Sequence, residues 1–268
     1  MPLGMVNGAG GGNSPEELFR AIPPVSKVII VSMVGLMIME VSGMMSPFQY
    51  AIIWPLVWKK FHVWRIITGA FYPGSPGFGT LISVYMMGSH SIRYEKDAFS
   101  TGGGGGSADY ALLLIFGISI LEILSVVFFN IPFILSSVLF MVIYVWSRKS
   151  PDSAVSFWGV RILAVYTPWA MVGLQLLLGQ SIFEAMLGIG VGHLYYFLID
   201  ILPDTHNIDI IQTPEFLVKL LGWGHEGTGV QRVVPNRGMP APGAVPAPRD
   251  IPRAGRTTWG PGRTLGTS

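Results

Sequence analysis

The chain has 268 residues, of which 50% are hydrophobic and only 12% are charged, with 17 Lys and Arg against 15 Asp and Glu. Soluble domains carry about 25% charged residues, so a mean hydropathy of +0.53 indicates an integral membrane protein and excludes an ordinary soluble domain. The net charge of +2 is too small to indicate a nucleic-acid partner, and the lack of cysteine excludes disulfides and thiolate metal sites.

Residues 1–25 are predicted to form a flexible cytosolic N-terminus. Its first 15 residues are rich in Gly, Asn and Ser, and a short amphipathic segment over 16–24 is stopped by Pro23 and Pro24. The segment lacks the basic-then-apolar pattern of a signal peptide, so we expect no cleavage.

The membrane domain is predicted to occupy residues 26–200. Apolar stretches predict six spanning helices, over 28–45, 78–92, 110–129, 133–146, 158–178 and 181–199. The second and fourth are short, at about 14–15 residues where a comfortable span takes about 20. Pro132 is placed to start the fourth span, and Pro168 is predicted to kink the fifth. Basic residues after the second and fourth spans predict that both termini are cytosolic.

An aromatic loop, residues 46–65, separates the first two spans. It alternates three tryptophans with three basic residues, namely Trp54, Trp58, Trp64, Lys59, Lys60 and Arg65. This mixture is typical of a segment in the lipid headgroup region. We expect its basic side chains to snorkel to the headgroups.

Three acidic residues interrupt the apolar spans. Glu40 and Glu184 are expected near the lumenal ends, where they reach headgroup water. Glu122 lies mid-span, and either lines a hydrophilic cavity or pairs with a polar neighbour such as Gln175. A proton-coupled small-molecule transporter is therefore an alternative function, although neither an internal repeat nor matched broken helices support it.

Two glycines organise the sixth span. Gly188 and Gly192 are four residues apart, so they share one helix face. In lipid, small residues at this spacing let a neighbouring helix approach closely. This face is predicted to be the packing seam of the bundle.

The chain turns polar after Asp200. Residues 201–221 are predicted to be a juxtamembrane amphipathic segment, with a helix over 208–221. Residues 222–268 are rich in Pro and Gly and carry six arginines against two acids, which predicts a disordered cytosolic tail.

Short motifs along the chain resemble, in order and spacing, the derlins, which are inactive relatives of the rhomboid intramembrane proteases. The motifs lie at 22–25, 64–65, 144–148 (with Trp146, Ser147 and Arg148), 177–181, 188–193 and 213–214. The resemblance implies an all-α polytopic membrane protein with a rhomboid-like core of six transmembrane helices. It further implies a protein of the endoplasmic reticulum membrane that assists retrotranslocation of misfolded client proteins, beside a membrane-embedded ubiquitin ligase.

The tail carries a second resemblance. Residues 259–266 are similar to the SHP box, a linear motif read by p97-class AAA ATPases; its matching positions are Trp259, Gly260, Gly262, Leu265 and Gly266. Two apolar anchors on an extended, glycine-rich backbone suit docking in a groove. The expected tail partner is such an ATPase.

We predict no catalytic residue, cofactor or metal. A rhomboid protease needs a Gly-x-Ser-Gly nucleophile in the fourth span and a histidine in the sixth. His193 is present, but Ser136 and Ser137 lack that context. His193 is therefore interpreted as a polar packing residue, with an active rhomboid-type protease as the alternative.

The predicted mechanism acts on the bilayer. Short spans force lipid to thin, and a thinner bilayer is easier for a polar polypeptide to cross. Trp64 and Arg65 are expected to help perturb the lumenal leaflet.

Overall fold

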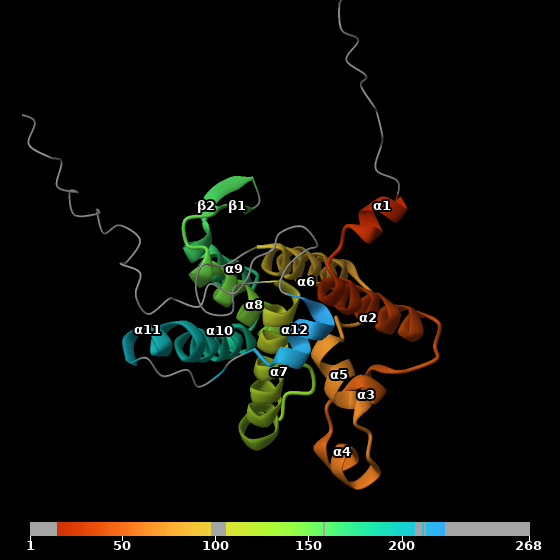
Figure 1. Ribbon diagram of the computed structural model, residues 1–268. Coiled ribbons are helices and arrows are strands. Elements are labelled where there is room, and N and C mark those ends of the chain that lie inside the picture. Colours follow the sequence, from red (N-terminus) through yellow and green to blue (C-terminus); the bar gives the residue numbers. More distant parts are fainter. Residues whose placement is uncertain (1–14, 98–105, 158, 207–210, 212, 223–268) are drawn as a thin grey trace, which may run out of the picture. The chain divides into compact units, whose positions relative to one another are not determined.

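The computed structural model describes residues 15–97, 106–157, 159–206, 211 and 213–222. The first half of the chain forms seven helices and one π-helical turn among the described residues. They are α1 (Pro15–Arg20), α2 (Pro24–Val41), α3 (Pro47–Tyr50), α4 (Trp54–Lys60), α5 (Trp64–Phe71), α6 (Phe78–Lys96), α7 (Gly106–Leu124) and the π-helical turn η1 (Ser125–Phe129). The second half comprises α8 (Leu135–Lys149), β1 (Ala154–Phe157), β2 (Val160–Leu163), the 3-10 turn η2 (Ala164–Tyr166), α9 (Thr167–Leu177), α10 (Phe183–Tyr196), the π-helical turn η3 (Phe197–Ile201), α11 (Leu202–His206) and α12 (Glu215–Leu221). Helices dominate the described chain (Figure 1).

By length and composition, three of the described helices can cross a membrane. They are α2 with 18 residues, α7 with η1 over 24 residues, and α10 with η3 over 19 residues. The chain is therefore a multi-pass membrane protein. The other three predicted spans correspond to α6, α8 and α9, of which α6 is less apolar and α8 and α9 are shorter than those three helices.

The structure corrects the predicted second and fifth spans. Helix α6 has 19 residues and so is not short, although its last turn is charged. Helix α9, which corresponds to the predicted fifth span, has only 11 residues, because the chain before it forms an antiparallel hairpin of β1 and β2. Pro168 lies in the first turn of α9 and starts that helix instead of kinking it, since a first-turn residue needs no N–H donor.

Helix α8 lies at the centre of the bundle. Every residue from Ser137 to Ser147 is buried, and α10, α7 and α6 pack around it (Figure 1). The helix starts at Leu135, three residues later than Pro132 suggested. A short helix is tolerated here because protein, and not lipid, covers most of its surface.

After Asp200 the described residues form two short helices, where the sequence predicts one helix over 208–221. The helical chain continues through α11 to His206. Helix α12 begins at Glu215 and packs on α7 through the buried Leu217. The N–H of Ala108 donates to the Gly222 carbonyl at 3.1 Å, which ties the end of α12 to the first turn of α7.

Candidate functional site

The closest helix contact lies where α10 crosses α8. A Cβ added at Gly188 would meet the Ser137 carbonyl group, at 2.8 Å from its carbon and 2.9 Å from Cα. At Gly192 the added atom would lie 3.1 Å from the Met141 carbonyl oxygen. The two helices thus approach backbone to backbone, as small residues in membrane helices allow. The opposite face is open, because nothing lies within 4 Å of a Cβ added at Gly190.

The serine and histidine of this interface have separate partners. The Ser137 hydroxyl donates to the Glu184 carbonyl at 2.8 Å. His193 is exposed, and its Nδ1 is 2.8 Å from the Tyr144 hydroxyl. A serine nucleophile needs its base within hydrogen-bond reach. The hydrogen bonds of these described residues therefore do not form a protease dyad.

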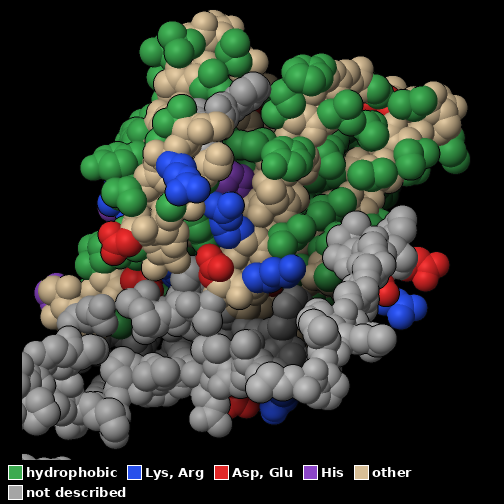
Figure 2. Space-filling view, turned by 90° about the horizontal axis from the view of Figure 1, so that it is seen from above, with side chains coloured by type: hydrophobic (Ala, Val, Ile, Leu, Met, Phe, Trp, Pro, Cys, Tyr) green, Lys and Arg blue, Asp and Glu red, His purple; other side chains and the backbone are tan. Residues whose placement is uncertain are grey.

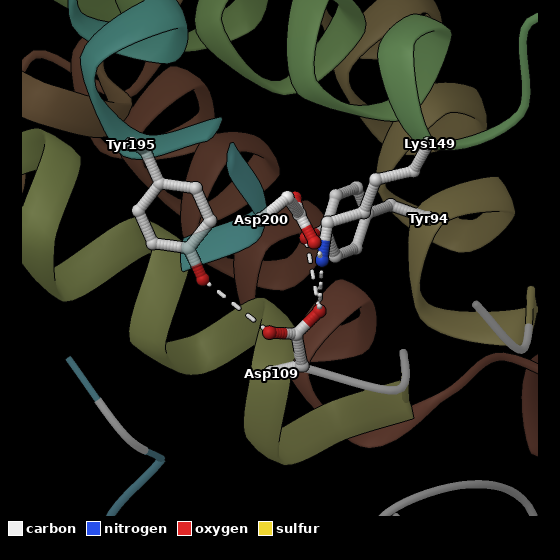
Figure 3. Close-up of polar contacts among 5 residues, drawn as sticks. All are labelled: Tyr94, Asp109, Lys149, Tyr195 and Asp200. Atoms are coloured by element: carbon white, nitrogen blue, oxygen red, sulfur yellow. Dashed lines mark hydrogen bonds and ion pairs between the residues drawn. The ribbon is translucent and has the colours of Figure 1, made fainter. Parts of the chain in front are cut away.

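A cluster of five residues with buried side chains joins the ends of five elements (Figure 3). Asp109 accepts hydrogen bonds from the Tyr94 hydroxyl at 3.0 Å and the Tyr195 hydroxyl at 3.3 Å. The Lys149 ammonium lies 3.4 Å from Asp109 and 3.9 Å from Asp200. We call these residues the polar cluster. They come from α6, α7, α8, α10 and η3, so they fasten one end of the bundle.

Helix dipoles favour the charges of the polar cluster. Asp109 lies in the first turn of α7, and Lys149 ends α8. An anion near a helix N-terminus and a cation near a C-terminus are each stabilised. Since both side chains are fully buried, removing one partner would leave the other charge desolvated and unpaired.

Glu95 forms a second fastening at the same end. Its Oε2 accepts from the N–H of Ser26 at 2.7 Å and from that residue's hydroxyl at 2.6 Å. Its Oε1 accepts from the Val25 N–H at 3.0 Å and the Ser107 hydroxyl at 2.6 Å. The carboxylate thus caps the first turn of α2 from another helix. We call the end marked by Glu95 and the polar cluster the polar end.

Sequence reasoning did not find the polar end. Glu95, Asp109 and Lys149 lie at the borders of apolar stretches, where charges normally mark the start of a loop. The available signal was acids and bases recurring at the ends of several spans. Only the fold shows that they meet. In a space-filling view of one face, charged side chains gather in the middle and hydrophobic ones cover much of the upper part (Figure 2).

The motif at the end of α8 also binds α6 at this end. The Trp146 indole N–H donates to Asp97 at 2.6 Å. Ser147 donates to the Tyr144 carbonyl at 2.7 Å, and the Arg148 guanidinium lies 5.1 Å from the Tyr144 ring. Of these three residues, Trp146 joins α8 to the end of α6, whereas the contacts given for Ser147 and Arg148 lie within α8.

Arg65 points into the loop and not towards headgroups. It is 4% exposed, and its Nη1 donates to the carbonyls of Phe48 and Ala51, both at 2.8 Å. Burial lowers the pKa of its guanidinium from the usual value. The expectation that Arg65 snorkels is therefore wrong, because one guanidinium nitrogen, Nη1, donates to both carbonyls inside the loop.

Around this buried anchor, the loop presents an exposed aromatic and basic surface. Its exposed side chains include Trp58, Lys59, Lys60, Phe61 and Trp64. Their mixture of aromatic rings and ammonium groups suits a headgroup layer.

The intramembrane acids differ in their surroundings. Glu40 accepts a 2.7 Å hydrogen bond from Tyr72. Burial raises the pKa of that tyrosine to about 12, so it remains a donor at neutral pH. Glu122 is buried, and one of its oxygens has no hydrogen-bond partner within the described chain. The side-chain oxygen of Gln175 likewise has no partner within the described chain, and the Gln175 amide does not donate to the unpartnered Glu122 oxygen.

Two predicted features lie outside the described residues. They are the tail motif, with Trp259, Gly260, Gly262, Leu265 and Gly266, and most of the five-glycine run at 102–106.

Comparison with known proteins gives a consistent result. The model of the Der1-like family matches residues 22–215. Derlin-1 of Arabidopsis thaliana is 34% identical over 233 residues, which is 86% of each chain. Derlin-1 of Homo sapiens is 32% identical over 256 residues, covering 93% of this chain and 97% of the relative. A relative named probable derlin-2 homolog, from Dictyostelium discoideum, is 32% identical over 213 residues, covering 77% of this chain and 82% of the relative.

Proposed function

Because this chain belongs to the Der1-like family, we propose that it is a non-catalytic protein of the endoplasmic reticulum membrane that assists retrotranslocation of misfolded proteins. It acts by thinning the bilayer locally and by recruiting a p97-class AAA ATPase through its cytosolic tail. Its further partners are a membrane-embedded ubiquitin ligase and the misfolded clients themselves.

The observation that carries the thinning proposal is the length of α9. Its 11 residues, together with the three of the preceding turn η2, rise about 21 Å, against a hydrocarbon thickness of about 30 Å. Trp169, Leu176 and Leu177 are exposed on it, so it presents an apolar surface to lipid. Helix α8 is also short, with 15 residues, but it is enclosed by other helices. The lipid-facing mismatch therefore comes from α9, not from the second and fourth spans.

Thinning lowers the barrier that a polar chain meets. Each unpaired backbone group costs several kcal/mol in hydrocarbon, so a shorter apolar path removes several such penalties. The mismatch itself costs the bilayer only fractions of a kcal/mol per ångström. The balance of these terms favours passage beside a short, rigidly held helix. Trp64 and the exposed surface of the aromatic loop are proposed to disturb the lumenal leaflet.

The partners of Ser137 and His193 support a mechanism without bond chemistry. Each is hydrogen-bonded elsewhere, to Glu184 and Tyr144 respectively. Reconstituted protein is expected to leave transmembrane substrates uncleaved. Cleavage that disappears in His193→Ala would instead establish the protease alternative.

The thinning proposal is tested by measuring headgroup-to-headgroup distance around the protein in lipid nanodiscs by electron cryomicroscopy. We expect a bilayer several ångströms thinner beside α9 than beside α2, because mismatch is local. Equal and ordinary thickness beside both helices would rule out thinning as the mechanism.

The tail proposal is tested separately by co-purification. Removing residues 257–268, or changing Trp259→Ala with Leu265→Ala, is expected to abolish binding of a p97-class ATPase without affecting membrane insertion. Thr267→Ala is the matched control outside the motif. Retained binding in the truncated chain would show that the tail motif is not the recruitment site.

A further inference from the structure

The hairpin between α8 and α9 is an unpredicted surface feature of the bundle. Its strands pair in antiparallel register, with Val155 opposite Ile162 and Ser156 opposite Arg161. Gly159 has a φ of +89°, which provides the left-handed backbone that a tight turn needs. The hairpin follows the polar end directly, because α8 ends at Lys149.

The hairpin is held close to the start of α9. Residue Leu163 ends β2, and Ala164 opens the turn that leads into α9, so there is no linker between them. The Ala164 N–H donates to the Ser153 carbonyl at 2.8 Å, which closes the base of the hairpin. Since α9 is apolar from its first turn, the hairpin stays at the level where the chain enters lipid.

One face of the hairpin extends beyond the protein. Cross-strand partners share a face and the faces alternate along a strand, so Val160 lies on the face of Val155 and Ile162. Near the base, that face packs on the bundle: Val155 is 5% exposed and Ile162 contacts the core. Val160 is 63% exposed, so the same apolar face continues without described protein beneath it. The opposite face carries the exposed Ser156 and Arg161 towards the tip and the exposed Leu163 at the base.

We propose that the hairpin Ala154–Leu163 lies in the lipid headgroup layer at the polar end, as a membrane-surface anchor for α9. Val160 contacts the upper acyl chains, and Arg161 faces phosphate groups and water. The occupant of the apolar face is lipid, because the hairpin is continuous with a lipid-facing helix and has no linker with which to leave the surface. Exposed Tyr166 and Trp169 extend the same interfacial belt into α9.

The anchor has a consequence for the bilayer. If the hairpin is fixed at headgroup depth, α9 cannot move towards the middle of the membrane and share the mismatch between both leaflets. The mismatch then falls on the leaflet opposite the hairpin. This placement depends only on the chain being a membrane protein, and it stands whether or not the protein assists retrotranslocation.

The test uses the cysteine-free sequence, in which single labels are unambiguous. Val160→Cys and its matched control Ser156→Cys carry an environment-sensitive fluorophore, and the full chain is reconstituted in phosphatidylcholine liposomes. Nitroxide lipids labelled near the top of the acyl chain are expected to quench the label at residue 160 several-fold more than the label at residue 156. A water-soluble quencher should show the reverse order. Equal quenching at both positions by both reagents would overturn the proposal.

A second variant separates lipid contact from other causes of protection. Val160→Asp, read through the label at residue 156, is expected to increase quenching by the water-soluble reagent, because a carboxylate lifts the hairpin from the acyl region. The label at residue 160 could instead be protected from the water-soluble quencher by a second copy of the chain. In that case nitroxide lipids would not quench it, and the protection would be lost when the protein is diluted in lipid. That result would also overturn the proposal.

Discussion

The contact of Gly188 with α8 allows a sharp prediction for Gly188→Ala. The added methyl group would fall against backbone atoms of Ser137, which cannot rotate away as a side chain can. Carbon atoms prefer a separation of about 3.5 Å or more. The added Cβ would lie 2.8 Å from the Ser137 carbonyl carbon, so the helices would have to part by at least about 0.7 Å. That movement also strains the hydrogen bond from Ser137 to the Glu184 carbonyl.

The expected loss in the free energy of unfolding of Gly188→Ala is large for one added methyl group. Overpacking costs about 1–3 kcal/mol, and a backbone obstacle places this case near the upper end. The higher helix propensity of alanine offsets up to about 1 kcal/mol. Gly190→Ala on the same helix gains the propensity without the clash, because its added atom meets nothing within 4 Å. The two variants should therefore differ by about 3 kcal/mol in the free energy of unfolding.

The measurement is unfolding in mixed detergent micelles, followed by the fluorescence of the eight tryptophans. Gly192→Ala should fall between the two, since its added atom would lie 3.1–3.2 Å from Met141 and Tyr144. Gly190→Ala is thus expected to be the most stable of the three variants, followed by Gly192→Ala and then Gly188→Ala. If Gly188→Ala proved as stable as Gly190→Ala, the close backbone approach would be refuted.

Three further predictions concern polar anchors. Arg65→Leu leaves two carbonyl acceptors without their donor and should expose the loop to protease, at a cost of about 1–3 kcal/mol for each buried group left unsatisfied. Asp109→Asn weakens the buried partner of Lys149 and should lower the unfolding free energy in detergent by up to about 3–5 kcal/mol, the range for breaking a buried ion pair. Trp146→Phe removes the donor to Asp97 and should cost about 1.5–3 kcal/mol, the range for a hydrogen bond to a charged group, in the same unfolding measurement.

Each of these has its own control. Lys59→Leu changes an exposed charge of the same loop, so protease sensitivity equal to that of Arg65→Leu would show that Arg65 is no anchor. Adding both Lys149→Met and Asp200→Asn to Asp109→Asn removes all three buried charges of the polar cluster and should recover part of the loss, and strictly additive losses would argue against their coupling. For Trp146→Phe, the partner change Asp97→Asn should remove most of the difference. A full loss in that background would assign the effect to packing of the ring.

Local patterns in the sequence were enough for the class of the protein and for several elements. Low charge and long apolar runs predict membrane helices because the bilayer requires each spanning segment to satisfy its own backbone. Family membership followed from short motifs whose order is itself a property of the chain. The short helix α1 was also local, since it lies between Pro15 and Pro23. Helix α2 begins at Pro24 and ends at Val41, so it lies four residues before the predicted span over 28–45, because Pro24 starts the helix instead of only ending the segment before it.

Some errors arose where two local rules competed. Inside an apolar stretch Pro168 predicts a kink, although a proline in a first turn is equally regular. Hydropathy alone places the residues before it in a span, while their alternation suits the hairpin that forms. Hydropathy measures the cost of leaving lipid or core and does not distinguish a buried strand from a helix.

What only the tertiary structure decided is which distant groups meet. Asp109 and Lys149 are 40 residues apart, and each alone resembles a charge at the edge of a loop. Arg65 similarly looks like a headgroup anchor until the loop folds around it. A charge is tolerated inside a protein only when partners from other elements surround it, and that condition depends on packing between helices rather than on neighbours in the chain. Composition therefore determined that this protein lies in a membrane, and the fold determined where its charges are paired.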